Sequence, residues 1–340
     1  MRLIDCDVHG RIGPVSEILP YLDRNWRDYM TESGVDSVDT KDYPASSPLA
    51  GSPDVTDAGV LAREHLDRNA VDRAVLVVLS AVPIIHNAYY AAALARAVNR
   101  YLAERWLADD ERLRGSLVVA PQDPQAAAEE IAHWAHDERF VQVLLPVLSR
   151  MPYGKKAFWP IYAAAADAGM PVALHAGSLM GDPPTAVGWP STHAEDYVAQ
   201  ASAFQSQLMS LVTEGVFHEH PALRVVLAES GFTWLPALMW RLDKNWKGLR
   251  REVPWITGYP SDVMREHIRL TVAPADAPDD ARQILDVVDQ LGADEMLLYA
   301  TDFPHEHGEP PPERWIDLLA PDRATKVRSA SALATYRGLG

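Results

Sequence analysis

Eight short, almost continuously apolar runs recur along the chain, separated by segments in which apolar residues recur at helical spacing. Such runs are typical of parallel strands that are buried on both faces. Eight right-handed βα units in succession close into a barrel, so we predict an α/β protein with a (β/α)8 TIM-barrel fold. The predicted strands are residues 3–9, 73–79, 115–120, 140–145, 171–175, 224–228, 268–272 and 296–301.

A doubly wound open sheet is the competing architecture. It is less well supported because no Gly-rich phosphate-binding turn follows the first strand. Local signals place several helices between the strands. Asn87 is the expected N-cap of a helix over residues 88–107, Asp123-Pro124 begins another, and Thr233 is the expected cap of a later one. Further helices are predicted at 54–69, before Gly169, and at 194–217.

The length and charge of the chain restrict its class. A chain of 340 residues can form one α/β barrel, so residues 1–340 are predicted to be a single domain. A formal charge of −16 argues against nucleic acid or an anionic membrane as a partner. Cys6 is the only cysteine, and no apolar stretch approaches the roughly 20 residues that cross a bilayer. We therefore expect a cytoplasmic protein that acts on a small molecule.

Two long polar loops interrupt the pattern, near residues 10–52 and 177–192. Each follows a predicted strand, which would place it over the mouth of the barrel, where βα loops commonly form the site. A connection as long as the first is either functional or a surface excursion. Trp189, in the second loop, is predicted to line a substrate pocket.

Polar, metal-competent residues end three of the predicted strands. Asp7 and His9 lie two positions apart in the first strand and therefore point to the same face. His175 ends the fifth strand and Asp302 the eighth. Because the carboxyl ends of barrel strands meet at one face, we predict that these four side chains hold one divalent metal. Zn²⁺ is the first expectation, and Mn²⁺ or Fe²⁺ would also suit these ligands.

Each of these residues has a structural alternative. Asp-x-His occurs by chance, His175 has a loop backbone beside it to hydrogen-bond, and Asp302 precedes Phe303-Pro304 and suits a turn. The metal prediction depends on their coincidence at the ends of strands on one barrel face.

Further residues are assigned to the same cavity. Glu229 ends the sixth strand and is predicted to bind the metal, to act in acid–base catalysis, or to hold the substrate; a structural ion pair is the alternative. His305 and His86 are predicted to contact the substrate, and His307 is either a pocket residue or a solvent-facing one. No role is assigned to the remaining histidines: His65, His133, His136, His193, His218, His220 and His267.

The chain resembles the amidohydrolase-related branch of the metal-dependent hydrolase superfamily, which contains aminocarboxymuconate-semialdehyde decarboxylase and gamma-resorcylate decarboxylase. The resemblance spans nearly the whole chain and is carried by Ile4-Asp5-Cys6-Asp7-Val8-His9, Pro171-Val172-Ala173-Leu174-His175-Ala176-Gly177, Leu223-Arg224-Val225-Val226-Leu227-Ala228-Glu229-Ser230-Gly231 and Ala300-Thr301-Asp302-Phe303-Pro304-His305. It implies a (β/α)8 barrel, a mononuclear metal held by Asp7, His9, His175 and Asp302, and a homodimer.

Two positions depart from the family pattern. The fourth strand ends in Leu144-Leu145-Pro146 without a lysine, so a dinuclear site bridged by a carbamylated lysine is not expected. The decarboxylases of this branch carry a histidine after the sixth strand for proton transfer. Glu229 or Ser230 occupies that place here, depending on where the strand ends.

Three functions are compatible with these residues. The first expectation is hydrolysis of a C–N or C–O acyl bond by metal-activated water, with Asp302 accepting the proton of the water and Glu229 assisting. The alternative is non-oxidative decarboxylation of a small aromatic or enoic acid, with the metal binding the substrate carboxylate. The third is a barrel that binds metal without catalysis.

Overall fold

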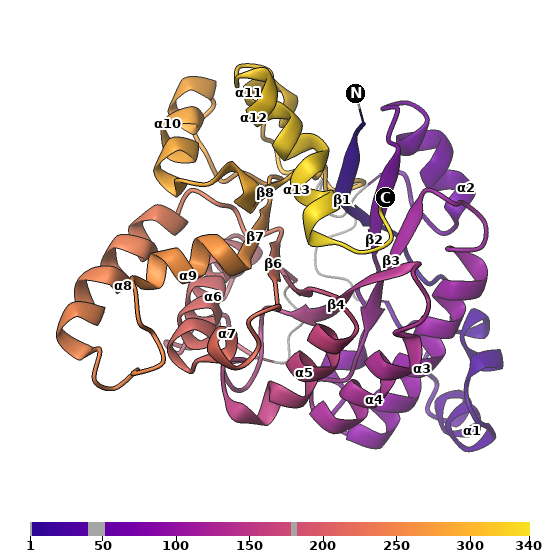
Figure 1. The fold of residues 1–340 in the computed structure, drawn as a ribbon. Coiled ribbons are helices and arrows are strands. Elements are labelled where there is room, and N and C mark those ends of the chain that lie inside the picture. Colours follow the sequence, from indigo (N-terminus) through magenta and orange to yellow (C-terminus); the bar gives the residue numbers. More distant parts are fainter. Residues whose placement is uncertain (1, 40–51, 178–181) are drawn as a thin grey trace.

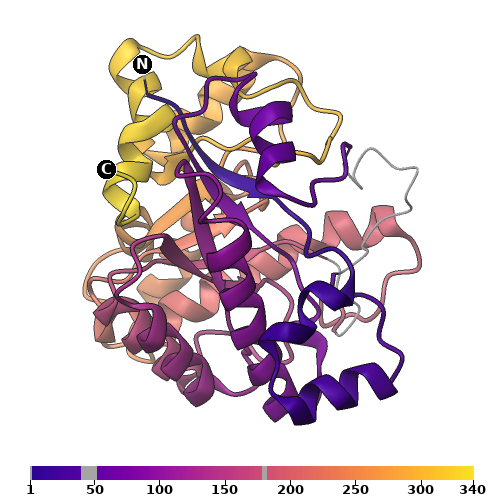
Figure 2. The same ribbon diagram turned by 90° about the vertical axis from the view of Figure 1, so that its right-hand side faces the viewer.

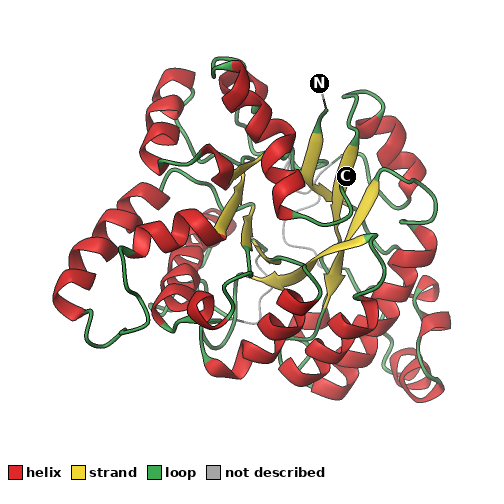
Figure 3. Ribbon diagram, in the orientation of Figure 1, coloured by secondary structure: helices red, strands yellow, loops and turns green. Residues whose placement is uncertain are grey.

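The computed structural model describes residues 2–39, 52–177 and 182–340. Eight parallel strands form one sheet in the sequential order β1 to β8, and helices surround it (Figures 1 and 3). This confirms the (β/α)8 barrel. The strands are β1 (Ile4–His9), β2 (Arg73–Val77), β3 (Leu113–Val118), β4 (Phe140–Pro146), β5 (Val172–His175), β6 (Val225–Ala228), β7 (Ile268–Thr271) and β8 (Leu297–Leu298).

The strands form the core because nearly all of their side chains are buried on both faces. Cys6 is 1% exposed and packs as a small apolar residue. The expectation that residues 1–340 form a single domain stays a prediction. Figure 2 shows both chain ends on the same side of the molecule.

The last strand is much shorter than the predicted 296–301, because only Leu297–Leu298 pair with β7. The chain beyond it turns to β1 instead and closes the barrel there. Cys6 N–H donates to the Tyr299 carbonyl (2.8 Å), and Asp302 N–H donates to the Asp7 carbonyl (3.1 Å). His9 N–H donates to the Phe303 carbonyl (2.7 Å). These hydrogen bonds between β1 and residues 299–303 form the seam that closes the barrel. The seam places Asp302 beside Asp7 and His9, the predicted metal ligands of β1.

The helices fill the connections between strands. They are α1 (Arg24–Glu32), α2 (Ala58–Leu61), α3 (Ala88–Arg105), α4 (Pro124–Trp134), α5 (Trp159–Asp167), α6 (His193–Thr213), α7 (Val216–Glu219), α8 (Leu235–Leu249), α9 (Pro260–His267), α10 (Ala281–Leu291), α11 (Glu313–Ile316), α12 (Pro321–Thr325) and α13 (Ser331–Thr335). π-helical segments η4 (Ala62–Leu66) and η8 (Lys326–Ala330) extend α2 and α12.

Two of the predicted caps are confirmed and one is wrong. Asn87 accepts from the N–H groups of Tyr89 and Tyr90 at the start of α3, and Asp123 accepts from Ala126 N–H at the start of α4. Thr233 does not cap α8, because its hydroxyl donates to the Asp276 carbonyl (2.7 Å) in the loop after β7. A tertiary hydrogen bond has replaced the local one that the sequence suggested.

Two predicted helices are also interrupted. The segment predicted as one helix over 54–69 is a short α-helix continued by a π-helical turn. The helix predicted over 194–217 divides into α6 and α7 at Gly215, which adopts φ +82°. A backbone in this left-handed region ends one helix and allows the next to begin at a new angle.

The two long loops predicted at 10–52 and 177–192 lie only partly within the described residues. In the first loop, the described residues include α1, while 40–51 lie outside the described residues, as do 178–181 of the second. Their predicted role over the barrel mouth stays a prediction. Within the described ranges, no helix combines the length and apolar character that a membrane span requires.

A glycine directly after the first-strand ligands is required by packing. A Cβ on Gly10 would clash with the indole ring of Trp106, which is fully buried and cannot move aside. We expect Gly10→Ala to lower the free energy of unfolding by about 1–3 kcal/mol, as overpacking does. Chemical denaturation measures this change.

Gly248→Ala is the matched control, because Gly248 lies in helix α8 and a Cβ there would meet no atom of the described structure within 4 Å. It should raise stability by about 0.5 kcal/mol. A Gly10→Ala protein as stable as the wild type would contradict the packing argument.

Candidate metal centre and its surroundings

The four predicted metal ligands converge at the carboxyl end of the barrel. Nε2 of His9 lies 2.8 Å from Oδ1 of Asp302 and 3.4 Å from Oδ1 of Asp7. Nε2 of His175 lies 3.4 Å from Oδ2 of Asp7. One ligand atom from each residue lies within 4.8 Å of the others, and all four residues are buried. Side chains from the first, fifth and eighth strand regions thus face one point.

Contacts with the backbone fix the orientation of two predicted ligands, His175 and Asp302. His175 Nδ1 lies 2.6 Å from the Ala176 carbonyl oxygen, which can only accept, so Nδ1 is the donor and the lone pair of Nε2 faces the cluster. Asp302 adopts φ +57°, a left-handed conformation that costs a non-glycine residue about 1–3 kcal/mol. The seam hydrogen bond from its N–H to β1 holds it there.

The donor atoms of this cluster fit a metal ion. Both carboxylate oxygens of Asp7 and Nε2 of His175 are buried without a hydrogen-bond partner among the described residues. Buried polar atoms are rarely left unsatisfied, because each costs about 1–3 kcal/mol. Two imidazoles and two carboxylates are ordinary ligands for a divalent transition metal. The clustering therefore indicates a metal site.

The charges of the cluster act strongly on one another. Burial alone would raise the pKa of Asp302, but His305 and His9 beside it hold that pKa well below its usual value. Burial would likewise lower the pKa of His9, but the carboxylates of Asp302 and Asp7 raise it well above its usual value. Carboxylates that stay ionised at neutral pH are suited to binding a cation.

Glu229 lies beside this cluster and is directed at it. It follows β6 with φ +54°, and its N–H donates to the Thr271 hydroxyl (2.9 Å) at the end of β7. Its Oε2 lies 3.7 Å from His175 Nδ1. Burial and the Asp302 carboxylate raise the pKa of Glu229. Ser230, in contrast, donates its hydroxyl hydrogen bond to the Gly231 carbonyl (2.7 Å), so Glu229 is the residue that faces the site.

Tyr197 and His307 connect Glu229 to Asp302, the last of the predicted metal ligands. The Tyr197 hydroxyl, on α6, donates to Glu229 Oε1 (3.1 Å) and lies 2.8 Å from Nδ1 of His307. Nε2 of His307 contacts Oδ2 of Asp302. Burial would lower the pKa of His307, but the Asp302 carboxylate raises it to about 9. The result is a connected row of polar groups along one wall of the site.

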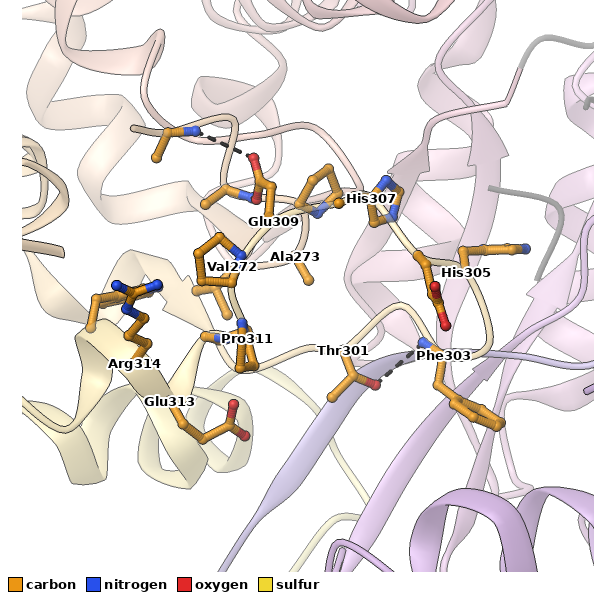
Figure 4. Close-up of a pocket in the computed structure, with 18 of the residues that line it drawn as sticks. Val272, Ala273, Thr301, Phe303, His305, His307, Glu309, Pro311, Glu313 and Arg314 are labelled. Carbon is orange, nitrogen blue, oxygen red and sulfur yellow. Dashed lines mark hydrogen bonds between the residues drawn. The ribbon is translucent and has the colours of Figure 1, made fainter. Parts of the chain in front are cut away.

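The predicted substrate-contacting residues differ in how closely they approach the ligands. His305 lies beside them, with Nδ1 3.2 Å from Asp302 Oδ1 and its ring 4.5 Å from that of His9. Figure 4 shows His305 and His307 on the loop that follows Thr301 and Phe303. His86 is exposed, and its Nε2 lies 2.7 Å from a guanidinium nitrogen of Arg150. Trp189 is 62% exposed in the loop between β5 and α6.

An apolar cavity adjoins His175 at the ends of β2 to β5. Valine, leucine, alanine and proline side chains make up most of its wall, including Val78, Val119 and Leu145. Its volume is about 20 Å³, which is room for about one water molecule and not for a substrate ring.

Three residues near the cluster were not predicted from the sequence: Tyr197, His65 and Asp5. Tyr197 lies within a long helix, where nothing local distinguishes it from a surface tyrosine. His65 falls in a helical segment, and Asp5 precedes the ligand pair without a pattern of its own. A charged residue inside an otherwise apolar strand was the one available signal for Asp5, because charged residues are rarely fully buried unless they are paired.

Known proteins resemble this chain over most of its length. The family model described as Amidohydrolase matches residues 4–335. Gamma-resorcylate decarboxylase from Rhodococcus jostii (strain RHA1) is 27% identical over 252 residues, which cover 69% of this chain and 73% of the relative.

Solved structures agree with the fold. The 5-carboxyvanillate decarboxylase from Sphingomonas paucimobilis matches with a TM-score of 0.71 and 20% identity, over 98% of each chain. A dihydroxybenzoic acid decarboxylase from Polaromonas sp. JS666, with bound manganese and the inhibitor 2-nitroresorcinol, matches with a TM-score of 0.69 and 19% identity. That match covers 98% of this chain and 96% of the other.

These comparisons overturn one expectation and leave another unsupported. Hydrolysis of an acyl bond is contradicted, because the relatives named here are decarboxylases. The clustered ligands indicate a metal site, but they do not favour zinc over another divalent ion, and one structural neighbour holds manganese. The error has a physical cause: the same two imidazoles and two carboxylates can hold a cation that activates water or one that binds a substrate carboxylate, so the ligand set does not discriminate between the reactions.

Proposed function

Because this chain belongs to the amidohydrolase family, we propose that it is a metal-dependent decarboxylase that releases CO2 from a small hydroxylated aromatic acid. The observation that carries the proposal is the buried cluster of four unsatisfied or ion-paired ligands in a chain whose relatives are decarboxylases of such acids.

Asp7, His9, His175 and Asp302 would hold one divalent metal, and we propose manganese because it is the ion in the neighbouring dihydroxybenzoic acid decarboxylase. A bound cation would supply the positive charge that binds the carboxylate and an adjacent hydroxyl oxygen of the substrate. This local charge is needed because the chain as a whole carries −16 and repels anions.

Glu229 is the proposed proton donor. It would protonate the ring carbon that carries the carboxylate, the bond from this carbon to the carboxylate would break, and the electron pair of that bond would return to the ring as CO2 leaves. Glu229 would then recover a proton from solvent. The hydrogen bond from Tyr197 holds Oε1, which leaves Oε2 on the side of His175.

His305, His86 and Trp189 are the proposed substrate contacts. His305 has the best-supported position, because it lies against His9 and Asp302.

The homodimer implied by the family resemblance also stays a prediction, which light scattering with size-exclusion chromatography would test. The cytoplasmic location stays a prediction.

CO2 release from carboxylated phenols tests the proposal directly. Protein stripped of metal with a chelator should be inactive, and addition of Mn²⁺ should restore activity. Anilides and lactones serve as the comparison substrates, for which no cleavage is expected. Absence of CO2 release from every carboxylated phenol by Mn²⁺-loaded protein would overturn the proposed function, and absence of turnover altogether would favour a non-catalytic metal-binding barrel.

A further inference from the structure

Asp5 is not one of the four clustered residues, but its carboxylate accepts several hydrogen bonds beside them. Its side chain is fully buried, two positions before Asp7, at an irregularity in the register between β1 and β2. Oδ1 accepts from Asp7 N–H (3.2 Å) and Thr301 N–H (3.1 Å). Oδ2 accepts from the Thr301 hydroxyl (2.6 Å) and from His65 Nε2 (2.8 Å). Four donors therefore converge on a single carboxylate.

These contacts lie at the seam where the barrel closes. Regular pairing between β1 and the chain after β8 is interrupted there, and the Asp5 carboxylate accepts the Thr301 N–H in place of a backbone carbonyl. One of its donors is the peptide N–H of the ligand Asp7, and another belongs to the residue directly before the ligand Asp302. Asp5 thus connects the backbone at both carboxylate ligands.

His65 fixes the orientation of this carboxylate from outside the strand. A carboxylate can only accept, so Nε2 of His65 is the donor, and Nδ1 lies 3.1 Å from the side-chain amide nitrogen of Asn69. The His65 ring stacks on Phe303, with centroids 4.6 Å apart and an interplanar angle of 15°. Phe303 N–H in turn donates to the Thr301 hydroxyl (3.3 Å), which Figure 4 shows as a dashed line.

We propose that Asp5, held by His65 and Thr301, is a positioning residue that sets the separation of Asp7 and Asp302 and thereby the affinity of the metal site. The inference rests on the metal site of the proposed function but not on the reaction. Groups that orient metal ligands typically contribute 10–100-fold to metal affinity. Asp5 acts through the backbone of the ligands, and neither it nor His65 contacts the ion or the substrate.

The test is the Mn²⁺ dissociation constant, measured by calorimetry and by the electron paramagnetic resonance signal of unbound Mn²⁺. His65→Phe keeps the stacked ring and removes the donor, and it should weaken Mn²⁺ binding by about 10–100-fold. Thr301→Val keeps the shape and removes the hydroxyl, and it should weaken binding by about 10-fold. Thr301→Ser restores the hydroxyl and should bind within about twofold of the wild type, since its hydrogen bond is kept.

Glu130→Gln is the matched structural control. Glu130 is also a buried carboxylate, bonded to Asn99 and Trp134 (2.8 Å each), between α3 and α4 and away from the seam. It should lower the thermal unfolding temperature without changing Mn²⁺ affinity. If His65→Phe and Thr301→Val also lower the unfolding temperature and leave Mn²⁺ affinity unchanged, the positioning role is overturned.

The two proposals fail in distinguishable ways. Wild-type protein that binds Mn²⁺ but releases no CO2 overturns the proposed function alone. A Thr301→Val protein that folds and binds Mn²⁺ as tightly as Thr301→Ser overturns the positioning role alone, even if His65→Phe fails to fold.

Discussion

His175→Ala is expected to lower kcat/KM for decarboxylation by about 10³-fold or more, and to weaken Mn²⁺ binding in parallel. His175 is fully buried, its Nδ1 is committed to the Ala176 carbonyl, and its Nε2 faces the cluster with no hydrogen-bond partner among the described residues. A metal ion stabilises transition-state charge by several kcal/mol, and each 1.36 kcal/mol is about tenfold in rate. Loss of one of four ligands should therefore remove most of this effect.

Metal content by elemental analysis and steady-state kinetics measure the two effects of this variant. His136→Ala is the control, because His136 is exposed after α4 and should leave both quantities unchanged. Excess Mn²⁺ should recover part of the lost activity if the remaining three ligands still bind the ion. Retention of wild-type metal content and rate by His175→Ala would remove it from the ligand set.

Glu229→Gln is expected to lower kcat by about 10²–10⁴-fold, the usual contribution of a positioned acid or base. Glutamine has the shape of glutamate and keeps an acceptor for the Tyr197 hydroxyl, but it has no acidic proton to deliver. Because Glu229 lies beside the four proposed ligands and is not one of them, Mn²⁺ affinity should change by no more than about threefold. The expected signature is a fall in kcat with KM and metal content nearly preserved.

Two variants refine the measurement on Glu229. Glu306→Gln alters an exposed carboxylate in the loop that carries Asp302 and should leave kcat unchanged. Tyr197→Phe removes the hydrogen bond to Glu229 and should lower kcat by up to about tenfold, in keeping with the value of a typical hydrogen bond. Equal kcat values for Glu229→Gln and wild type would exclude Glu229 as the proton donor.

The departure at strand six is clarified by these contacts. Sequence reasoning left Glu229 and Ser230 as alternatives for the position that a histidine holds in the decarboxylases of this branch. The Ser230 hydroxyl donates its hydrogen bond to the backbone. Glu229 adopts a positive φ, and its carboxylate lies between His175, Tyr197 and Asp302. A sequence cannot distinguish these outcomes, because one residue of difference in where a strand ends exchanges the faces of its side chains.

Local patterns predicted some elements well and others poorly. The caps at Asn87 and Asp123 were predictable because both hydrogen bonds lie within three residues along the chain. Thr233 was assigned wrongly because its partner, Asp276, is distant in sequence. The shortened β8 has the same origin: the residues from Tyr299 onward pair with β1, and only closure of the barrel decides that.

The barrel and the convergence of Asp7, His9, His175 and Asp302 were predictable from local patterns, because parallel apolar strands bring their carboxyl ends to one face. Tertiary structure alone decided the surroundings of that cluster: the wall formed by Tyr197, His307 and Glu229, and the Asp5 carboxylate at the seam. Those contacts join residues from different strands and helices. Their geometry is set by how the barrel packs and closes, which no short-range pattern encodes.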